Sequence, residues 1–222
     1  MDIENLKNFV IFNDLNKIEL QEALKALSAF EKKYEKNSII HSAGTLTDRM
    51  GLVLAGSLII ERNDMLGNRT VLSHVGRGEF FAETYALLAT EPMLVDVRAN
   101  DDCHILFIRL YRLKEFLATG DTWALKIANN LLSILAYKNL KLSRRSFHTS
   151  PKTIRGRVLA YLTSTSLQKG NREFDIPFDR QQLADYLNLD RTALSKELGK
   201  MQREGIISVK KNHFKLYFTE NN

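Results

Sequence analysis

Cysteine is almost absent from this chain of 222 residues, and Cys103 is the single example. One cysteine cannot form a disulfide within the chain, nor supply the ligands of a four-cysteine metal or iron–sulfur site. Long apolar runs are also missing, and without a stretch of 18 apolar residues we expect no membrane span. The N-terminus carries acids and lacks the basic start and apolar core of a signal peptide. We therefore expect a cytoplasmic protein without a metal centre.

Positive charge is unevenly distributed along the chain, whose formal net charge is +6. Residues 1–149 hold 19 Lys and Arg against 18 Asp and Glu, a net of +1, whereas residues 150–222 hold 13 against 8, a net of +5. Basic charge attracts nucleic-acid phosphates whatever the base sequence. The hydrophobic fraction of 44% is ample for packed cores, so the length predicts one large or two modest ordered domains.

Residues 179–203 have the pattern of two short amphipathic helices joined by a tight turn near Asn188. Asp179 is a good N-cap for the first helix, with Gln182 as its capping-box partner, and Asp190 can cap the second. The apolar positions recur at helical spacing: Leu183, Ala184, Leu187, Leu194, Leu198 and Met201. This pattern predicts a helix-turn-helix, although an ordinary helical hairpin with a solvated charged face fits it as well.

The remaining face of the second helix carries hydrogen-bond donors, most of them cationic. They are Arg191, Thr192, Ser195, Lys196 and Lys200. Such a helix fits the major groove of DNA, where Arg or Lys can bond guanine O6 and N7. Two β-rich runs, Gly205–Val209 and Phe214–Phe218, flank a basic turn with Lys210 and Lys211, which predicts a wing after the recognition helix. We expect Arg180, at the start of the preceding helix, to contact the DNA backbone together with the wing.

The segment from residue 29 to residue 108 is rich in short candidate strands separated by turn signals, which predicts a sandwich or barrel. The candidates are Ala29–Tyr34, Ser38–His41, Gly51–Leu54, Ser57–Glu61, Thr70–Val75, Val95–Ala99 and His104–Ile108. A helical pattern over residues 3–28 precedes them, and a brief helix over Phe81–Leu88 interrupts them.

A longer helix is predicted from Thr122 to His148, and it carries two apolar stripes. The first has coiled-coil spacing and contains Leu125, Ala128, Leu132, Leu135, Asn139 and Leu142. The second stripe, Ile127, Leu131 and Ile134, is expected to pack on the β-rich domain. Two stripes need two partners, which favours a dimerisation helix over a single core helix with a wide apolar face. Pro151 is expected at the first position of the next helix.

Three segments in this order resemble the Crp/Fnr superfamily of bacterial transcription regulators, which is related to the cyclic-AMP receptor protein. Gly51–Leu58 is similar to the family's β-roll glycine pattern, Gly78–Glu83 to its phosphate-binding cassette, and Lys152–Leu162 to the first helix of its DNA domain. The resemblance implies an α+β fold with a cyclic-nucleotide-binding-like β-roll, or double-stranded β-helix, over residues 1–120. It further implies a dimerisation helix over 121–148 and a winged helix-turn-helix domain over 149–222.

The same resemblance implies a homodimer that binds an inverted-repeat operator in duplex DNA and contacts RNA polymerase. Many family members carry a glutamate at the position of Thr192, so the half-site is expected to differ from the familiar one. The effector pocket maps onto a cassette with several departures: Gly78, Glu79, Phe80, Ala82, Glu83, Met93 and Leu94. The family's phosphate-binding Arg-Ser pair is replaced by Met93 and Leu94, and a buried phosphate needs a cation or N–H donors. We therefore expect no cyclic AMP binding.

Other cofactors are also disfavoured. An Fnr-type iron–sulfur cluster needs N-terminal cysteines, and residues 1–102 contain none. Haem would need axial ligands from Cys103, His41, His74 or His104, and we expect these side chains to be structural or exposed, with Cys103 packed as a small hydrophobe. The effector is thus unknown.

Two other functions remain as alternatives. One is a cyclic-nucleotide-binding module that acts on a partner protein, which the basic C-terminal third argues against. The other is a cupin-like enzyme, but the histidines lack cupin spacing and no nucleophile–base pair is visible. A transcription regulator without enzymatic activity is the preferred interpretation.

Overall fold

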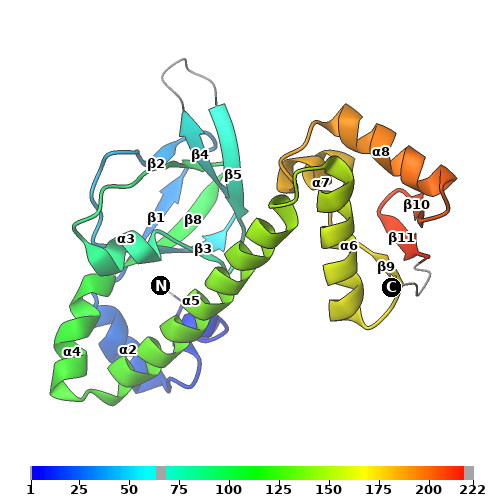
Figure 1. Cartoon of the computed structure of the whole chain (residues 1–222). Coiled ribbons are helices and arrows are strands. Elements are labelled where there is room, and N and C mark those ends of the chain that lie inside the picture. Colours follow the sequence, from blue (N-terminus) through cyan, green and yellow to red (C-terminus); the bar gives the residue numbers. More distant parts are fainter. Residues whose placement is uncertain (1, 64–68, 218–222) are drawn as a thin grey trace. The chain divides into compact units, whose positions relative to one another are not determined.

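The computed structural model describes residues 2–63 and 69–217 and is shown in Figure 1. The chain forms two compact units, residues 1–135 and 136–222. The boundary between them falls inside the long helix α5, Thr122–Thr149, so each half of this helix belongs to a different unit. The two units are described in turn.

The first unit begins with three short helical segments rather than one. They are α1 Ile3–Leu6, the 3-10 turn η1 Val10–Phe12, and α2 Lys17–Ala26. The prediction of a helical pattern over residues 3–28 was wrong at residues 7–9 and again at residues 13–16. There Asp14 adopts a left-handed conformation, with φ of 64°. Asn16 then starts a new helix, because its side chain accepts a hydrogen bond from the backbone N–H of Glu19, whose carboxylate accepts one from the N–H of Asn16.

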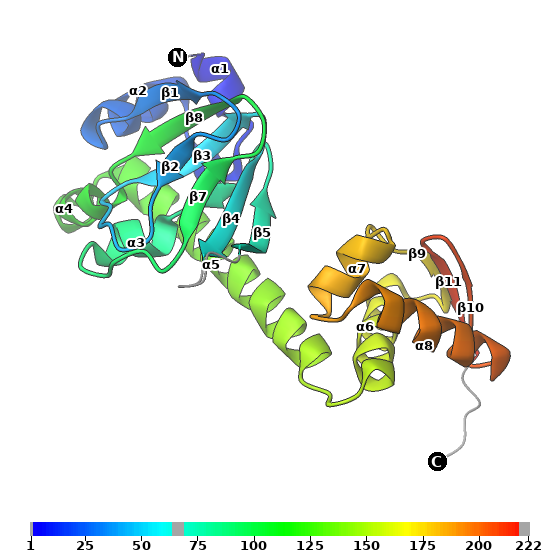
Figure 2. The ribbon, with the colours of Figure 1, turned by 90° about the horizontal axis from the view of Figure 1, so that it is seen from above.

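Two four-stranded antiparallel sheets form the body of the first unit. Their orders are β1-β8-β3-β6 and β2-β7-β4-β5, and Figure 2 shows the strands of the second sheet side by side. The strands are β1 Phe30–Tyr34, β2 Ile39–His41, β3 Met50–Ala55, β4 Leu58–Asn63, β5 Arg69–Val75, β6 Phe80–Phe81, β7 Asp96–Ala99 and β8 Cys103–Ile108. All seven predicted strands are confirmed within a few residues. The two-residue β6 was not predicted.

Two glycines of the β-roll pattern are required by close packing. A Cβ at Gly51 would lie 2.2 Å from the ring of Phe81, and one at Gly56 would lie 2.4 Å from the carbonyl oxygen of Asp102. Gly56 also has φ of +77°, which side chains disfavour. These glycines therefore let β3 and the following turn approach their neighbours directly.

Three helical segments flank the strands of the first unit: α3 Glu83–Leu88, η2 Leu110–Arg112 and α4 Leu113–Thr119. The brief helix predicted over residues 81–88 is confirmed in shortened form, whereas η2 and α4 were not predicted. The first half of α5 packs on the same core through Ile127, which has no exposure, and Leu131, which is 5% exposed. Its second apolar stripe therefore packs on the β-rich domain, as predicted.

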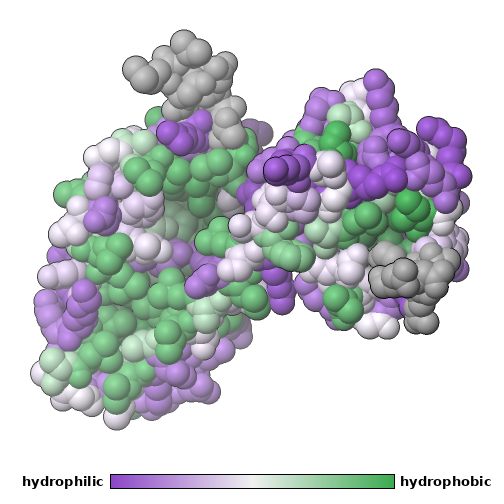
Figure 3. All heavy atoms as spheres, in the orientation of Figure 1, coloured by the Kyte–Doolittle hydropathy of each residue, from purple (hydrophilic) through white to green (hydrophobic). Residues whose placement is uncertain are grey.

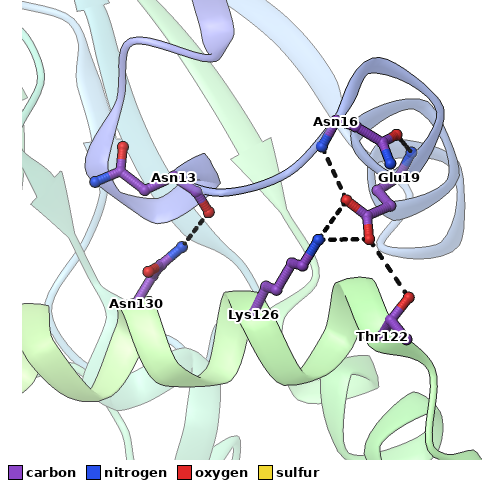
Figure 4. A network of polar contacts seen from close by, with 6 residues as sticks. All are labelled: Asn13, Asn16, Glu19, Thr122, Lys126 and Asn130. Carbon is purple, nitrogen blue, oxygen red and sulfur yellow. Dashed lines mark hydrogen bonds and ion pairs between the residues drawn. The ribbon is translucent and has the colours of Figure 1, made fainter.

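Polar contacts also fix the first half of α5, as Figure 4 shows. Lys126 donates to both carboxylate oxygens of Glu19 at 2.7 Å. The side-chain amide of Asn130 donates to the carbonyl oxygens of Ile11 and Asn13 at 3.1 and 2.9 Å. The N-terminal segments and α5 are thus held together by direct hydrogen bonds.

Up to residue 217, where its described residues end, the second unit contains three helices after α5 and a three-stranded antiparallel sheet of order β10-β11-β9. Its elements are α6 Ile154–Lys169, β9 Glu173–Asp175, α7 Arg180–Tyr186, α8 Arg191–Arg203, β10 Ile207–Lys210 and β11 His213–Leu216. The hairpin of β10 and β11 is the predicted wing, and Phe218 of the predicted second strand lies outside the described residues. Pro151 does not open α6, because Thr153 is its N-cap and accepts from the N–H of Gly156.

Candidate nucleic-acid interface and effector pocket

The helix-turn-helix is built by the two caps that the sequence predicts. Asp179 accepts from the backbone N–H of Gln182 at 2.8 Å, and the Gln182 side chain accepts from the N–H of Asp179 at 2.9 Å. Asp190 accepts from the N–H of Ala193 at 2.8 Å and starts α8. Between the helices, Asn188 adopts the left-handed conformation of a tight turn, with φ of 53°.

The apolar faces of α7 and α8 are buried in the core of the second unit. Leu183, Ala184, Leu187, Leu194, Leu198 and Met201 are each at most 2% exposed. They pack with residues of α6 and of the wing, including Val158, Leu162 and Phe214. This packing fixes which side of α8 faces solvent.

The predicted DNA-reading residues all lie on that solvent side of α8. Arg191, Thr192, Ser195, Lys196 and Lys200 are exposed. Figure 3 shows hydrophilic side chains gathered over this helix. The structure thus brings all five onto one surface.

Arg155 of α6 binds acidic residues that would otherwise weaken the positive charge beside α8. Its Nε donates to Glu197 at 2.6 Å, and its Nη1 lies 2.7 Å from a carboxylate oxygen of Glu204. These two carboxylates raise the pKa of Arg155, and Arg155 in turn lowers the pKa of Glu204. Sequence reasoning missed this arginine, since its partners lie 42 and 49 residues away.

Arg180 has a different environment from the exposed residues of α8. Its side chain is partly buried, and its Nη2 donates to the carbonyl oxygen of Lys211 at 3.4 Å in the wing turn. Burial lowers the pKa of Arg180. Lys210 and Lys211 are exposed, and Lys211 adopts φ of 56°. Arg180 therefore holds the wing turn in addition to its expected contact with DNA.

The cassette residues of the first unit are placed by the end of β6 and the start of α3. Gly78 and Ala82 have positive φ of +83° and 60°, and Glu79 accepts from the N–H of Gly76 at 2.8 Å. Phe80 is buried in the core, and Glu83 is 7% exposed in the first turn of α3. The segment thus has a left-handed backbone at two positions and a buried carboxylate at its last position.

Met93 and Leu94 differ from a phosphate-binding pair because their side chains are apolar, and because one is buried in the core while the other is exposed to solvent. Met93 is 2% exposed and packs in the roll core with Val53, Phe81 and Val97. Leu94 is 72% exposed. Arg98 lies on β7, as predicted, where its Nε donates to Glu61 at 2.8 Å. Neither Met93 nor Leu94 therefore supplies a cation that could pair with a phosphate.

Comparison with known proteins decides the family. The model of the cyclic nucleotide-binding domain matches residues 31–119, and that of the Crp-like helix-turn-helix domain matches residues 156–217. The chain is 23% identical over 202 residues to the CRP-like protein Clp of Xanthomonas oryzae, covering 85% of this chain and 84% of Clp. The chain belongs to the Crp/Fnr family of transcription regulators. It is accordingly a Crp-like DNA-binding regulator, in a family that is not enzymatic.

Solved structures show the same fold. The structure of the c-di-GMP-responsive global regulator CLP of Xanthomonas campestris has a TM-score of 0.60 at 20% identity, covering 92% of this chain and all of that chain. The catabolite activator protein of Thermus thermophilus has a TM-score of 0.50 at 22% identity, with 94% and 93% covered. The predicted α+β architecture of a Crp/Fnr protein is confirmed.

The predicted dimer residues of this Crp/Fnr chain lie in two environments on α5. Leu125, Leu132 and Leu142 are 54%, 67% and 68% exposed, and Asn139 is exposed as well. Ala128 and Leu135 are instead partly buried against the core of the first unit. The leucines that remain exposed are thus the ones still available to a partner.

Two further arginines hold the helix-turn-helix turn, and sequence reasoning missed both. Arg145 of α5 donates to the carbonyl oxygens of Tyr186 and Asp185 at 3.2 and 3.3 Å, at the end of α7. Arg157 of α6 donates to the carbonyl oxygens of Leu187 and Asn188 at 3.1 and 2.9 Å. Cations at these carbonyls satisfy the open end of α7. In the sequence, these two arginines are distinguished only as positive charges that precede the helix-turn-helix.

The residues considered as haem or metal ligands are dispersed. His104 lies 3.0 Å from Glu31, His74 is exposed on β5, and Cys103 is buried. Burial, with Asp102 and Asp101 nearby, raises the pKa of the Cys103 thiol. Across residues 2–63 and 69–217, three or more His, Cys, Asp or Glu side chains are nowhere grouped to hold a metal ion. Within the same residues, the helices are too short or too polar to cross a membrane.

Proposed function

We propose that this protein is a homodimeric, sequence-specific transcription regulator whose effector is not a cyclic nucleotide. The observation that carries the proposal is the outward face of α8, where Arg191, Thr192, Ser195, Lys196 and Lys200 are exposed together on a helix that packing holds in one orientation. A helix that presents such donors can read base edges in the major groove, and the basic wing can bind phosphates.

Dimerisation is supported by the exposed leucines of α5, since Leu125 and Leu132 are seven residues apart and Leu142 follows Asn139 by three. Apolar residues at this spacing pack as a two-stranded seam, in which a polar residue such as Asn139 fixes register. Figure 3 shows apolar side chains gathered on the face of the first unit that carries α5. We accordingly propose residues 121–148 as the dimerisation helix between a sensor domain, 1–120, and a DNA domain, 149–222.

A two-fold dimer would present its two recognition helices about 34 Å apart, which is one turn of DNA, so the operator would be an inverted repeat. Such a regulator would act by contacting RNA polymerase at the promoter.

The exclusion of cyclic nucleotides rests on Met93 and Leu94. The side chains of Met93 and Leu94 carry neither a cation nor an N–H donor, and Met93 fills the roll core, so neither can bond a phosphate. A buried phosphate without a cation is unfavourable because its desolvation is not compensated.

The test is selection of duplexes from a random pool by the full chain, followed by titration of the selected site. An inverted repeat with two half-sites about one helical turn apart supports the proposal. Binding without sequence preference contradicts it. A variant with Arg191→Ala, Lys196→Ala and Lys200→Ala should lose the sequence preference. The control variant with Lys17→Ala, Lys25→Ala and Lys36→Ala in the first unit also loses three positive charges, and it should keep the preference.

A further inference from the structure

A cavity of about 520 Å3 opens beside β1 in the first unit. Phe30, Lys32 and Tyr34 line it from one side of the strand, because successive strand residues point to opposite faces. Phe107 of β8, His41 of β2 and the loop of residues 46–49 complete most of the lining. The described cassette positions are not part of it. Its volume lies within the range of roughly 300–1,000 Å3 typical of small-molecule sites.

Aromatic rings form the walls of this cavity. Phe30 stacks on Phe107 with centroids 5.3 Å apart and an interplanar angle of 21°. Tyr34 and His41 meet Phe107 edge-on, with centroids at 6.4 and 6.1 Å. Phe30 nevertheless stays 36% exposed. A flat ring that stacks on this group would cover apolar surface that the chain leaves in contact with water.

Two cations lie on the rings that line the cavity. The Nζ of Lys32 is 4.7 Å from the centroid of the Tyr34 ring, and the guanidinium of Arg49 is 5.0 Å from that of Phe30. Asp48 also lines the cavity, and it lies 3.7 Å from Arg49 and 3.1 Å from Arg109. Within the part of the chain that the structure describes, Lys32 has no carboxylate partner. The lining therefore has an excess of positive charge.

Two polar nitrogens of lining residues are buried without a hydrogen bond in the described structure. They are the Nε of Arg49, which lies 3.7 Å from the Asp48 carboxylate without a hydrogen bond to it, and the Nε2 of His41. The Arg49 Nε is always a donor, and an anionic oxygen is the acceptor that bonds it most strongly. The Nε2 of His41 donates or accepts according to its tautomer. The Arg49 guanidinium thus adds a donor for an anion to the aromatic walls of the cavity.

We propose that the cavity binds a small planar aromatic anion of the carboxylate class, with its ring against Phe30 and Phe107 and its charge against Lys32 and Arg49. Binding at this site does not depend on the regulator function, whereas its role as the effector site rests on that proposed function. The site would give the sensor domain a ligand without the cassette, whose phosphate-binding pair is replaced by Met93 and Leu94.

The test uses 2-naphthoate as the probe, titrated into the isotopically labelled full chain and followed by backbone amide NMR. Shifts should be largest at residues 30–34, 46–49 and 107. The neutral analogue 2-naphthalenemethanol and the non-aromatic cyclohexanecarboxylate should each bind at least about tenfold more weakly, because each lacks one of the two recognised features. Equal binding of either analogue overturns the proposal, as do shifts confined to the cassette or to α5.

Two variants on the same strand provide a matched comparison. Lys32→Gln should weaken 2-naphthoate binding about tenfold, since it removes a charge-assisted contact. Lys33→Gln should leave the affinity unchanged, because Lys33 lies on the opposite face of β1. Equal effects of the two substitutions would overturn the site. The titration contains no DNA, so its result can be interpreted even if the duplex selection fails. If the duplex selection succeeds but 2-naphthoate does not bind, only the ligand site is overturned.

Discussion

The Nε of Arg98 donates to Oε1 of Glu61 at 2.8 Å, and the Glu61 side chain has no exposure to solvent. The same guanidinium donates through Nη1 to the carbonyl oxygen of Asn37 at 2.8 Å. Arg98 therefore ties β7 to β4 and to the turn before β2. Arg98 is the first arginine after the cassette along the chain, and it serves the fold.

Removal of Arg98 should accordingly destabilise the first unit. Arg98→Met leaves a buried carboxylate without its arginine, which should lower the free energy of unfolding by on the order of 3 kcal/mol. Urea denaturation followed by circular dichroism measures the change. Arg62→Met, at an exposed position on β4, is the matched control and should change stability by less than about 0.5 kcal/mol. Equal stability of the two variants would contradict a structural role for the ion pair.

Dimerisation is tested most directly at Leu132, which is 67% exposed on α5. Leu132→Asp would place a charge in the proposed seam, so it should yield monomers that keep their fold but lose operator affinity. Analytical ultracentrifugation measures the mass. Asn129→Asp adds the same charge at another exposed position of the helix and should remain dimeric. A dimeric Leu132→Asp protein would show that the subunits meet elsewhere.

Cyclic nucleotides should not bind at the cassette. Calorimetric titration of the full chain with cyclic AMP and with cyclic GMP should detect no binding in the micromolar range, because Met93 fills the core and Leu94 is exposed. A micromolar dissociation constant for either nucleotide would show that other residues supply the phosphate contacts.

The pH dependence of wing stability should follow His213. Hydrogen bonds with Asp175 at 2.9 Å and with Glu173 at 3.2 Å raise the pKa of His213 above its usual value. A group with a raised folded-state pKa stabilises fully below its unfolded pKa of about 6.5, and loses that contribution as pH rises through the folded pKa. As the pH rises from neutral to mildly alkaline, the urea concentration at the unfolding midpoint should therefore decrease more for the native protein than for His213→Gln. Parallel curves for the two proteins would exclude this linkage.

The sequence predicted the elements that local chemistry determines. Asp179 and Asp190 cap α7 and α8 as expected, because an N-cap bonds backbone groups only a few residues away. The strands of the roll were found for a similar reason, since glycine and asparagine turns mark their ends. Local rules also place the exposed donors of α8, because the buried leucines fix its orientation.

Elements that depend on distant partners were missed. The strands β6 and β9 have two and three residues, and they exist because they pair with β3 and β11. The same holds for Arg155, whose role depends on Glu197 and Glu204 far along the chain. Their sequence neighbourhood contains no pattern that distinguishes these residues from ordinary surface positions.

The recognition helix should separate into residues that read bases and residues that hold phosphates. Arg191 is exposed at the first position of α8, so Arg191→Ala should cost roughly 1–3 kcal/mol at the selected site and relax the preference at one base pair per half-site. Lys211→Ala, in the wing turn, should instead weaken all duplexes alike and flatten the salt dependence, because phosphate contacts carry no base information.

Arg180→Ala should combine both structural and electrostatic effects, since Arg180 also bonds the carbonyl oxygen of Lys211. It should weaken all sequences at least as much as Lys211→Ala does, without altering the preferred bases. Titrations of each variant against the selected and a scrambled duplex at two salt concentrations separate these cases. If Arg191→Ala keeps both the affinity and the preference of the native protein, Arg191 does not read sequence, and base recognition must come from the remaining donors of α8, led by Lys196.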